Sequence, residues 1–435
     1  MMRKVELIDI GRSMTWLFAA AVLLCVSAFP VAAQQEIGVD IFGSQSAGVV
    51  RLSVPFPALK GGVAAQAIHT PFFSPLTRDL AFSEIFALIP LPPNTSPTLE
   101  VAKRAGAQAF LTLEISLEAN EYVIEARLYD VATKSVQLGR RYRGTGGALT
   151  RIAHMIASDL VRYFNGRPGI FLTQVAYVSN ASGQKEIWLM DYDGSNKRRI
   201  TSHGSIALSP DWSPDGEQLV YTAFNPRGSD LYLVSRRGGG RIRIQTGVNL
   251  NTAPRFSPDG RDIAFVGSIA GNPDIYLIAA DGSNRRRITS ASSIESTPGW
   301  SPTGRQIAFT SGRAGSPQIY VMDAEGTNVR RISYDGDWND DPSFSPDGEL
   351  LAYTSRVAGR FQIRIMNLTT QESRIIAGEG SNEQPAWSPD GKWLLFTSNR
   401  SGRWQIYRVG VDGRDLMQLT TEGDNTAPRW SNLPR

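Results

Sequence analysis

The hydrophobic and polar positions in the second half of the chain repeat every 43 or 44 residues. Each complete copy begins with an aromatic residue and a turn of the Ser-Pro-Asp-Gly type, as in Trp212–Gly216, although Thr303 replaces the aspartate in one copy. The aromatic residues of the copies are Trp212, Phe256, Trp300, Phe344, Trp387 and Trp430. A period of this length is typical of an array of similar structural units.

Within each copy, the turn is followed by short segments with the alternation of β-strands. In the turn, proline presets φ, aspartate can accept a backbone N–H ahead of it, and glycine completes the reversal. The first complete copy then predicts strands over Gln218–Thr222 and Asp230–Val234, and the next copy predicts an outer strand over Arg286–Thr289. Four antiparallel strands per copy predict a blade of a β-propeller.

The two ends of the repeat region complement each other. The segments Gln174–Ser179, Glu186–Met190 and Arg198–Thr201 match the second, third and fourth strands of a copy, but no aromatic-Ser-Pro unit precedes them. Trp430-Ser431 supplies that missing unit at the other end. We therefore expect a ring of six blades closed by pairing of N- and C-terminal strands, which removes free sheet edges. The aromatic residues should pack between neighbouring blades.

Residues 34 to 165 do not repeat, and their pattern predicts a small α/β domain. Helices are expected over Leu76–Leu88 and Leu149–Phe164, and His154 lies beside the apolar stripe of the second helix, which suggests a surface or boundary position. Strands are predicted over Gly48–Val54, Phe110–Leu117, Glu121–Leu128 and Ser135–Tyr142. The predicted organisation is an α/β domain over 34–165, a linker over 166–169 and a propeller over 170–435.

Residues 1–33 have the features of a cleaved signal peptide. Basic residues precede an apolar run from Met14 to Phe29, and Val31-Ala32-Ala33 supplies small residues for cleavage after Ala33. An uncleaved anchor is the alternative, but the run is short for a membrane span and ends at Pro30. Cys25, the only cysteine, would leave with the signal, which suits an oxidising compartment. We expect no membrane insertion after cleavage.

Composition and motifs point away from several function classes. The formal charge of +4 is spread along the strands without a concentrated basic patch, so no nucleic-acid partner is expected. The sequence lacks a G-x-S-x-G elbow, and His69, His154 and His203 have no metal-like spacing. We therefore expect no catalytic residue, no metal ligand and no cofactor. The sequence leaves open whether carboxylates at the mouth of the channel hold a calcium ion weakly.

The loops that lead from the outer strand of one blade to the inner strand of the next should surround the channel on one face. They are rich in Asn, Thr, Ser and acidic residues, which suits hydrogen bonding to a polypeptide, although solvated loops have the same composition. These loops are Gly204–Ser209, Val248–Pro254, Ile294–Pro298, Asp335–Pro342, Gly380–Pro385 and Gly423–Pro428.

The order of a signal peptide, an α/β domain and a six-bladed ring of such repeats resembles the TolB family of the Tol-Pal envelope system, over essentially the whole chain. The segments that carry this resemblance beyond the repeat itself are Gly48–Pro57, Ser158-Asp159, Val175–Val178 and Ala427–Ser431. The resemblance implies a monomeric, non-catalytic periplasmic adaptor. Its ring would bind the peptidoglycan-associated lipoprotein Pal, and its mature N-terminus would bind TolA. Such an adaptor supports outer-membrane integrity and constriction during cell division.

The resemblance also implies where the partners bind. Pal-facing positions would be Leu250, Asn251, Thr252, Ala253, Ser296 and Thr297. The N-terminal switching segment would be Gln34, Gln35, Glu36, Ile37, Gly38, Val39, Asp40 and Ile41, whose alternating apolar residues suit strand addition. Two other functions stay open from the residues alone. One is a propeller enzyme, peptidase-like or sugar-acting, and the other is a propeller that binds a small ligand or a glycan.

Overall fold

The computed structural model describes residues 48–269 and 271–433. The predicted signal peptide with cleavage after Ala33 and the predicted switching segment over 34–41 lie outside the described residues.

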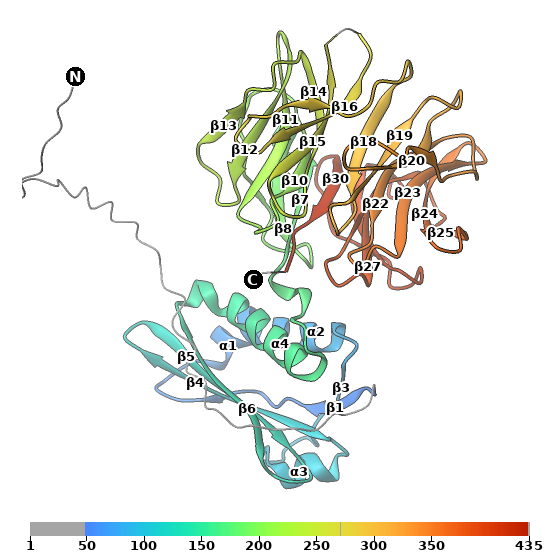
Figure 1. The fold of residues 1–435 in the computed structure, drawn as a ribbon. Helices are drawn as coiled ribbons and strands as arrows, with labels where there is room; N and C mark the ends of the chain where they lie inside the picture. The colour runs from blue at the N-terminus through green and yellow to red at the C-terminus, as the bar shows by residue number, and fades with distance from the viewer. Residues whose placement is uncertain (1–47, 270, 434–435) are drawn as a thin grey trace, which may run out of the picture.

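The N-terminal part is one mixed sheet with the helices α1 (Ala65–Ile68), α2 (Ser74–Phe82) and α4 (Leu149–Asn165) on the face that points to the propeller, whereas α3 (Leu99–Arg104) lies at the far end of the domain (Figure 1). Its strands are β1 (Val50–Ser53), β2 (Ala58–Leu59), β3 (Phe86–Leu88), β4 (Ala109–Glu118), β5 (Glu121–Asp130) and β6 (Val136–Gly144), in the order β3-β1-β4-β5-β6 with β2 beside β4. The apolar stripe of α4, including Ile152 and Ile156, is buried, because it packs into the core over this sheet.

Two predictions in this domain are wrong. The helix expected over Leu76–Leu88 ends at Phe82, because Glu84 adopts a positive φ of 60° and the next residues form β3, which pairs with β1. His154 is only 3% exposed rather than at the surface. Its Nδ1 lies 2.5 Å from Oδ2 of Asp79, in the region where the propeller covers the helices. The periodicity of a single helix cannot include burial by a second domain.

The remainder of the described chain is a six-bladed β-propeller, as predicted, in which each blade is a four-stranded antiparallel sheet. Blade 1 contains β10 (Ala207–Trp212), β11 (Gln218–Asn225), β12 (Gly228–Ser235) and β13 (Arg241–Ile244). Blade 2 contains β14 (Leu250–Phe256), β15 (Asp262–Ser268), β16 (Asp274–Ala279) and β17 (Arg286–Arg287). Blade 3 contains β18 (Glu295–Trp300), β19 (Gln306–Ser311), β20 (Gln318–Asp323) and β21 (Arg330–Arg331). Blade 4 contains β22 (Asn339–Phe344), β23 (Leu350–Val357), β24 (Arg360–Asn367) and β25 (Ser373–Ala377). Blade 5 contains β26 (Asn382–Trp387), β27 (Trp393–Ser398), β28 (Gln405–Gly410) and β29 (Met417–Gln418).

Blade 6 closes the ring with strands from both ends of the repeat region. It consists of β30 (Asn425–Trp430), β7 (Gln174–Ser179), β8 (Glu186–Asp191) and β9 (Arg198–Arg199). The inner strand β30 pairs with β7 in an antiparallel register that places Asn425 opposite Ser179 and Trp430 opposite Val175. The predicted closure is therefore confirmed.

The repeated aromatic residues join each blade to the one before it. The indole Nε1 of Trp300 donates to the carbonyl of Arg255 on β14 at 3.2 Å, and that of Trp387 donates to the carbonyl of Ser343 on β22 at 2.9 Å. Trp212 makes the same bond to the carbonyl of Arg429. Each ring also lies in or against an apolar cluster between two blades. This confirms the predicted position of the aromatic residues between blades.

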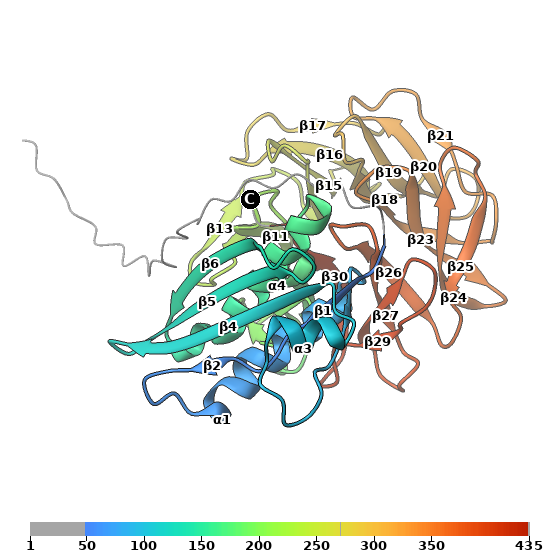
Figure 2. The ribbon, with the colours of Figure 1, turned by 90° about the horizontal axis from the view of Figure 1, so that it is seen from below.

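The α/β domain rests on one side of the ring, next to blades 5 and 6 (Figure 2). Phe82 at the end of α2 stacks on Trp393 of β27, with ring centroids 4.7 Å apart. Nζ of Lys392 lies 3.1 Å from Oε2 of Glu84. These contacts use the Ser-Pro-Asp-Gly turns, so the opposite side of the ring does not face the α/β domain. Among the described residues, no helix is long and apolar enough to cross a membrane.

Candidate binding face and central channel

The side of the ring away from the α/β domain is called the free face here. It is formed by the loops between the second and third strands of each blade and by those between the fourth strand and the next inner strand. The latter loops cover residues 200–206, 245–249, 288–294, 332–338, 378–381 and 419–424.

Large apolar side chains are exposed on the free face over blades 1 to 3. Ile206 is 42% exposed and Ile294 is 60% exposed, both in loops that lead to an inner strand. Ile269 is 57% exposed in the connection between β15 and β16, and Tyr334 is 67% exposed after β21. Phe224, near the end of β11, is 36% exposed. Apolar side chains gathered around one mouth of a channel are typical of a protein-binding surface.

Ile206 and Ile294 belong to loops that the sequence predicts to surround the channel, but only the polar residues of these loops were expected to bind a partner. The signal was present in the sequence, since Ile206 and Ile294 lie within otherwise polar loops. Ile200 and Ile332, directly after an outer strand, are buried in blade cores, whereas Ile206 and Ile294, directly before an inner strand, face solvent.

Blades 4 and 5 make the other side of the same mouth acidic. Asp340 accepts hydrogen bonds from Thr297 Oγ1 at 2.9 Å and Thr310 Oγ1 at 2.7 Å. Burial, followed by repulsion from Asp340, raises the pKa of Glu383. The same two causes raise the pKa of Asp341 to about 7. The free face therefore combines an apolar side with a side of closely spaced carboxyl groups.

Each inner strand carries a bulge at the same place, which brings backbone and side chains into the channel. The residue at the bulge has a positive φ between 45° and 60° and precedes a proline in every blade. These residues are Ser209, Ala253, Thr297, Asp341, Gln384 and Ala427. The register against the second strand shifts at each bulge, for example between Thr252 and Arg255. A bulge of this kind re-aims side chains in the direction of a site.

Below the bulges, the channel contains a charged layer. Asp211, Arg255 and Arg429 lie there, and Asp211 Oδ2 accepts the backbone N–H of Phe256 at 2.9 Å. Nε of Arg429 lies 4.0 Å from Oδ1 of Asp211. Burial lowers the pKa of Arg429, and repulsion from Arg255 adds to this effect. The opposite blades supply only small side chains at this level, from Gly299, Ser343 and Ala386.

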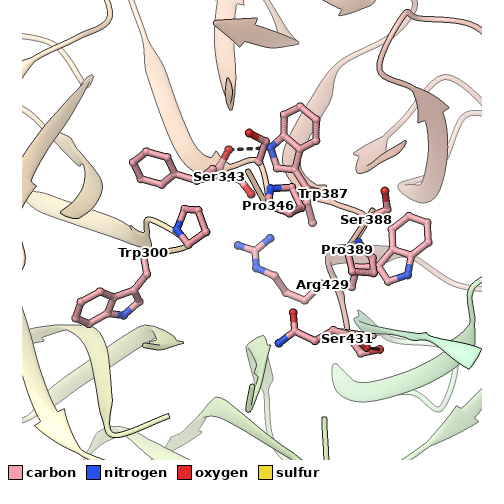
Figure 3. A pocket seen from close by; sticks show the side chains of 14 residues that line it. Trp300, Ser343, Pro346, Trp387, Ser388, Pro389, Arg429 and Ser431 are labelled. Carbon is pink, nitrogen blue, oxygen red and sulfur yellow. Dashed lines mark hydrogen bonds between the residues drawn. The ribbon is translucent and has the colours of Figure 1, made fainter. Parts of the chain in front are cut away.

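The small side chains leave a pocket of about 230 Å³ at the end of the channel where the Ser-Pro-Asp-Gly turns lie. Figure 3 shows the guanidinium of Arg429 reaching into the middle of this pocket, between Trp300, Pro346 and Ser431. The pocket is thus an open hollow with one prominent cation, on the side of the ring opposite to the free face.

The six predicted partner-facing residues have different environments. Leu250 and Thr252 on β14 and Ser296 on β18 are partly exposed near the mouth. Ala253 and Thr297 belong to the layer of bulges inside the channel, where Thr297 donates to Asp340. The structure thus places these five residues around the mouth and the upper channel.

Asn251 is fully buried, unlike Leu250 and Thr252 on either side of it. Its Nδ2 donates to the carbonyl of Ser229 at 2.7 Å and to that of Val248 at 2.9 Å, which joins the start of β14 to blade 1. Asn339, Asn382 and Asn425 hold the same place in later blades, and each donates to a glutamine on the third strand of the preceding blade. A substitution of Asn251 therefore tests cohesion of the blades and cannot report a direct partner contact.

Neither metal ligation nor a hydrolase triad is evident in residues 48–269 and 271–433. No group of three or more His, Cys, Asp or Glu side chains could hold a metal ion in this part of the chain. The buried pair of Asp79 and His154 is the nearest approach to a catalytic dyad. However, Nε2 of His154 has no hydrogen-bond partner within the same ranges, so the pair does not activate a hydroxyl group there.

Comparisons with known proteins agree with this architecture. The family described as the TolB beta propeller domain matches residues 162–433. The Tol-Pal system protein TolB of Syntrophotalea carbinolica is 36% identical over 214 residues, which are 46% of this chain and 47% of that protein. The protein of the same name from Geobacter sulfurreducens is 34% identical over 205 residues, or 45% and 48% of the two chains. The chain thus spans about half the length of the curated relatives it matches.

The crystal structure of TolB from Acinetobacter baumannii is similar over the whole fold. It superposes with a TM-score of 0.74 at 24% identity, covering 92% of this chain and 99% of that one. At this identity the likeness concerns the fold, including the α/β domain placed before the propeller.

Proposed function

Because the chain belongs to the TolB β-propeller family, we propose that it is a non-catalytic periplasmic adaptor of the Tol-Pal system that binds protein partners. The partner on the free face is Pal, the peptidoglycan-associated lipoprotein. The partner of the mature N-terminal segment, residues 34–41, is TolA. The adaptor acts as a monomer and supports the integrity of the outer membrane and its constriction at division.

The observation that carries this proposal is the apolar side of the free face. Ile206, Ile269 and Ile294 expose between 42% and 60% of their surface on this face. Burying such side chains against a partner stabilises a complex by about 25 cal/mol for each Å² removed from water. The nearby carboxylates of Asp340 and Glu383 favour a partner that presents basic or hydrogen-bond donor groups to blades 4 and 5.

The proposal assigns the protein no resident cofactor. A calcium ion in the channel would be held only weakly, by the carboxylates of Asp340 and Glu383 at its mouth. Neither binding of Pal nor binding of TolA depends on this ion in the proposal.

The test is a calorimetric titration of the mature protein with the soluble domain of Pal from the same organism. We expect saturable one-to-one binding. The substitution Ile294→Asp should weaken it by about tenfold or more, because a charge would enter an apolar contact.

The matched control is Val329→Asp, which introduces the same charge at an exposed residue, 37% accessible, on the side of the ring that carries the α/β domain. This variant should bind as the unsubstituted protein does. Absence of binding by the unsubstituted protein, or an equal loss in both variants, would contradict the proposed docking face.

A further inference from the structure

The repeat allows one position to be compared between blades, and blade 3 shows two side chains that cover its outer groove. The guanidinium of Arg313 lies over the ring of Tyr320, 4.9 Å from the ring centroid. The guanidinium of Arg331 lies 4.9 Å from the centroid of Tyr334, so the tyrosine ring covers this arginine. Tyr320 and Arg331 are paired across β20 and β21.

Blade 2 keeps the underlying pair and lacks both covering residues. Tyr276 and Arg287 are paired across β16 and β17 in the same register. The backbone around the arginine is equivalent as well, since Nε of Arg287 donates to the carbonyl of Thr289 at 2.8 Å. At the positions of Arg313 and Tyr334, however, this blade has Ile269 and Ser290.

Because Ile269 and Ser290 stand in place of the covering arginine and tyrosine, blade 2 has a pocket of about 300 Å³ at its rim. It is lined by Ile269, Asn272, Asp274, Tyr276, Arg285 and Arg287. Blade 1, which has Asn225 and Thr246 at the two covering positions, also has a pocket there, of about 410 Å³.

The edges of the two arginines in the blade 2 pocket are already occupied. Nη2 of Arg287 lies 2.6 Å from Oδ2 of Asp274, and Nη1 of Arg285 donates to the carbonyl of Thr246 at 2.5 Å. Because Asp274 neutralises Arg287, a small anion gains little there. The face of the Arg287 guanidinium remains available, since 45% of this side chain is exposed. A flat aromatic ring uses that face by cation–π stacking.

We propose that this rim pocket of blade 2 binds an aromatic side chain, of the tyrosine type, presented by a protein partner. The ring would stack on Arg287 as Tyr334 stacks on Arg331, with Ile269 as an apolar wall and Asn272 at its polar edge. Ile269 also belongs to the free face, so the pocket extends that face outward. In assigning the aromatic group to a partner, the inference rests on the proposed adaptor function.

The pocket itself can be tested without any partner. Protein with ¹³C-labelled isoleucine methyl groups is titrated with N-acetyl-L-tyrosinamide while the Ile269 signal is followed by NMR. We expect a saturable shift of this signal. The substitution Ser290→Tyr, which copies Tyr334, should raise the dissociation constant by about fivefold, the loss expected for one cation–π contact of about 1 kcal/mol.

Three controls distinguish an aromatic pocket from an unspecific apolar site and from an anion site. Ser290→Ala should leave the dissociation constant unchanged, and the remaining isoleucine signals should show that both variants are folded. N-acetyl-L-leucinamide should shift Ile269 less, and sodium acetate should not shift it in a saturable way. An equal response to leucinamide or acetate, or no effect of Ser290→Tyr, overturns the aromatic pocket in favour of an unspecific apolar or an anion site.

A second titration, with the soluble domain of Pal, separates this inference from the proposed function. Weaker binding to Ser290→Tyr than to Ser290→Ala supports the pocket as part of the docking face. If Ile294→Asp weakens binding and Ser290→Tyr does not, the docking face stands and the assignment of the pocket to this partner fails. If the unsubstituted protein does not bind, the proposed function fails while the tyrosinamide result still decides the pocket.

Discussion

One residue in the channel, Asp341, makes the stability of the protein depend on pH. Burial and the neighbouring Asp340 raise the pKa of Asp341 from 3.8 to about 7. A carboxyl group whose pKa is raised by folding binds its proton more tightly in the folded state. Its contribution to stability is therefore fully present below about pH 4 and is lost as the pH rises to about 7.

The substitution Asp341→Asn should remove this pH dependence. Asparagine tolerates the positive φ of 52° at this position and cannot ionise. Since Asp341 is partly exposed to the channel, we expect the variant to be more stable than the original protein by only about 1–2 kcal/mol at about pH 8. The difference should shrink at about pH 5. Urea unfolding at the two pH values measures it.

Asp337→Asn is the matched control, because the hydrogen bond from Arg356 lowers the pKa of Asp337. Its folded pKa lies below the unfolded one, so the ionised form is favoured at neutral pH. The control should therefore gain no stability at about pH 8. An equal gain in both variants would contradict the account given for Asp341.

Among the elements, the inner strands hold the ring together through the repeated aromatic residue. Phe256 and Phe344 show that phenylalanine fits this position, but only tryptophan can donate to the preceding blade. Trp387→Phe should therefore lower the free energy of unfolding by about 1–2 kcal/mol, because the carbonyl of Ser343 loses its donor. Chemical denaturation measures this loss.

Trp404→Phe serves as the control for the loss of an indole group. Within 48–269 and 271–433, Trp404 makes a hydrogen bond through its backbone carbonyl, which accepts from Asn425, and none through its indole nitrogen, so this substitution should cost less. A larger loss for Trp404→Phe would show that ring volume, and not the bond between blades, determines stability.

The elements also show what the sequence could predict. The blades and their closure followed from the turn chemistry and the period, because every copy confirmed the others. The strand β3 was hidden, since Phe86–Leu88 continues an apolar run that also fits a helix. At the candidate site, the predicted loops Val248–Pro254 and Ile294–Pro298 lie mostly in the inner strands β14 and β18, because the bulge and proline in each inner strand resemble a loop in sequence. Burial of Asn251 was not predictable either, because asparagine is equally common in exposed loops.

For the whole molecule, the relation between the two domains depends on a small buried network. Asp79 of α2 accepts hydrogen bonds from the hydroxyl group of Tyr192 and from Nδ1 of His154. Beside it, Nη2 of Arg78 lies 2.5 Å from Oδ2 of Asp193, which again connects the α/β domain with blade 6. Buried polar groups that are hydrogen-bonded across an interface favour one orientation of the partners.

Asp79→Asn should loosen this connection without unfolding either domain. The neutral amide offers one acceptor where the carboxylate offers two, so at least one of the bonds from Tyr192 and His154 to the carboxylate is lost or replaced by a weaker neutral bond, at a cost of about 1–2 kcal/mol. In differential scanning calorimetry, we expect the α/β domain to unfold at a lower temperature than the propeller, as a separate transition.

Asp159→Asn is the control, because Asp159 accepts a hydrogen bond from Tyr142 inside the α/β domain, at 2.7 Å. This variant should be less stable but should keep the original coupling of the two transitions. Separate transitions in the control, or a single one in Asp79→Asn, would show that the network does not couple the domains.

The closure of blade 6 has a consequence for synthesis. Strand β7 cannot obtain its inner neighbour until residues 425–430, synthesised about 250 residues later, have left the ribosome. Until then, the edge of β7 stays unpaired and the face of blade 5 that packs on β30 stays uncovered, and both can attract other chains. A translation product that stops before β30 keeps this unpaired edge exposed. We therefore expect proteases and chaperones to recognise it and to remove it before it accumulates.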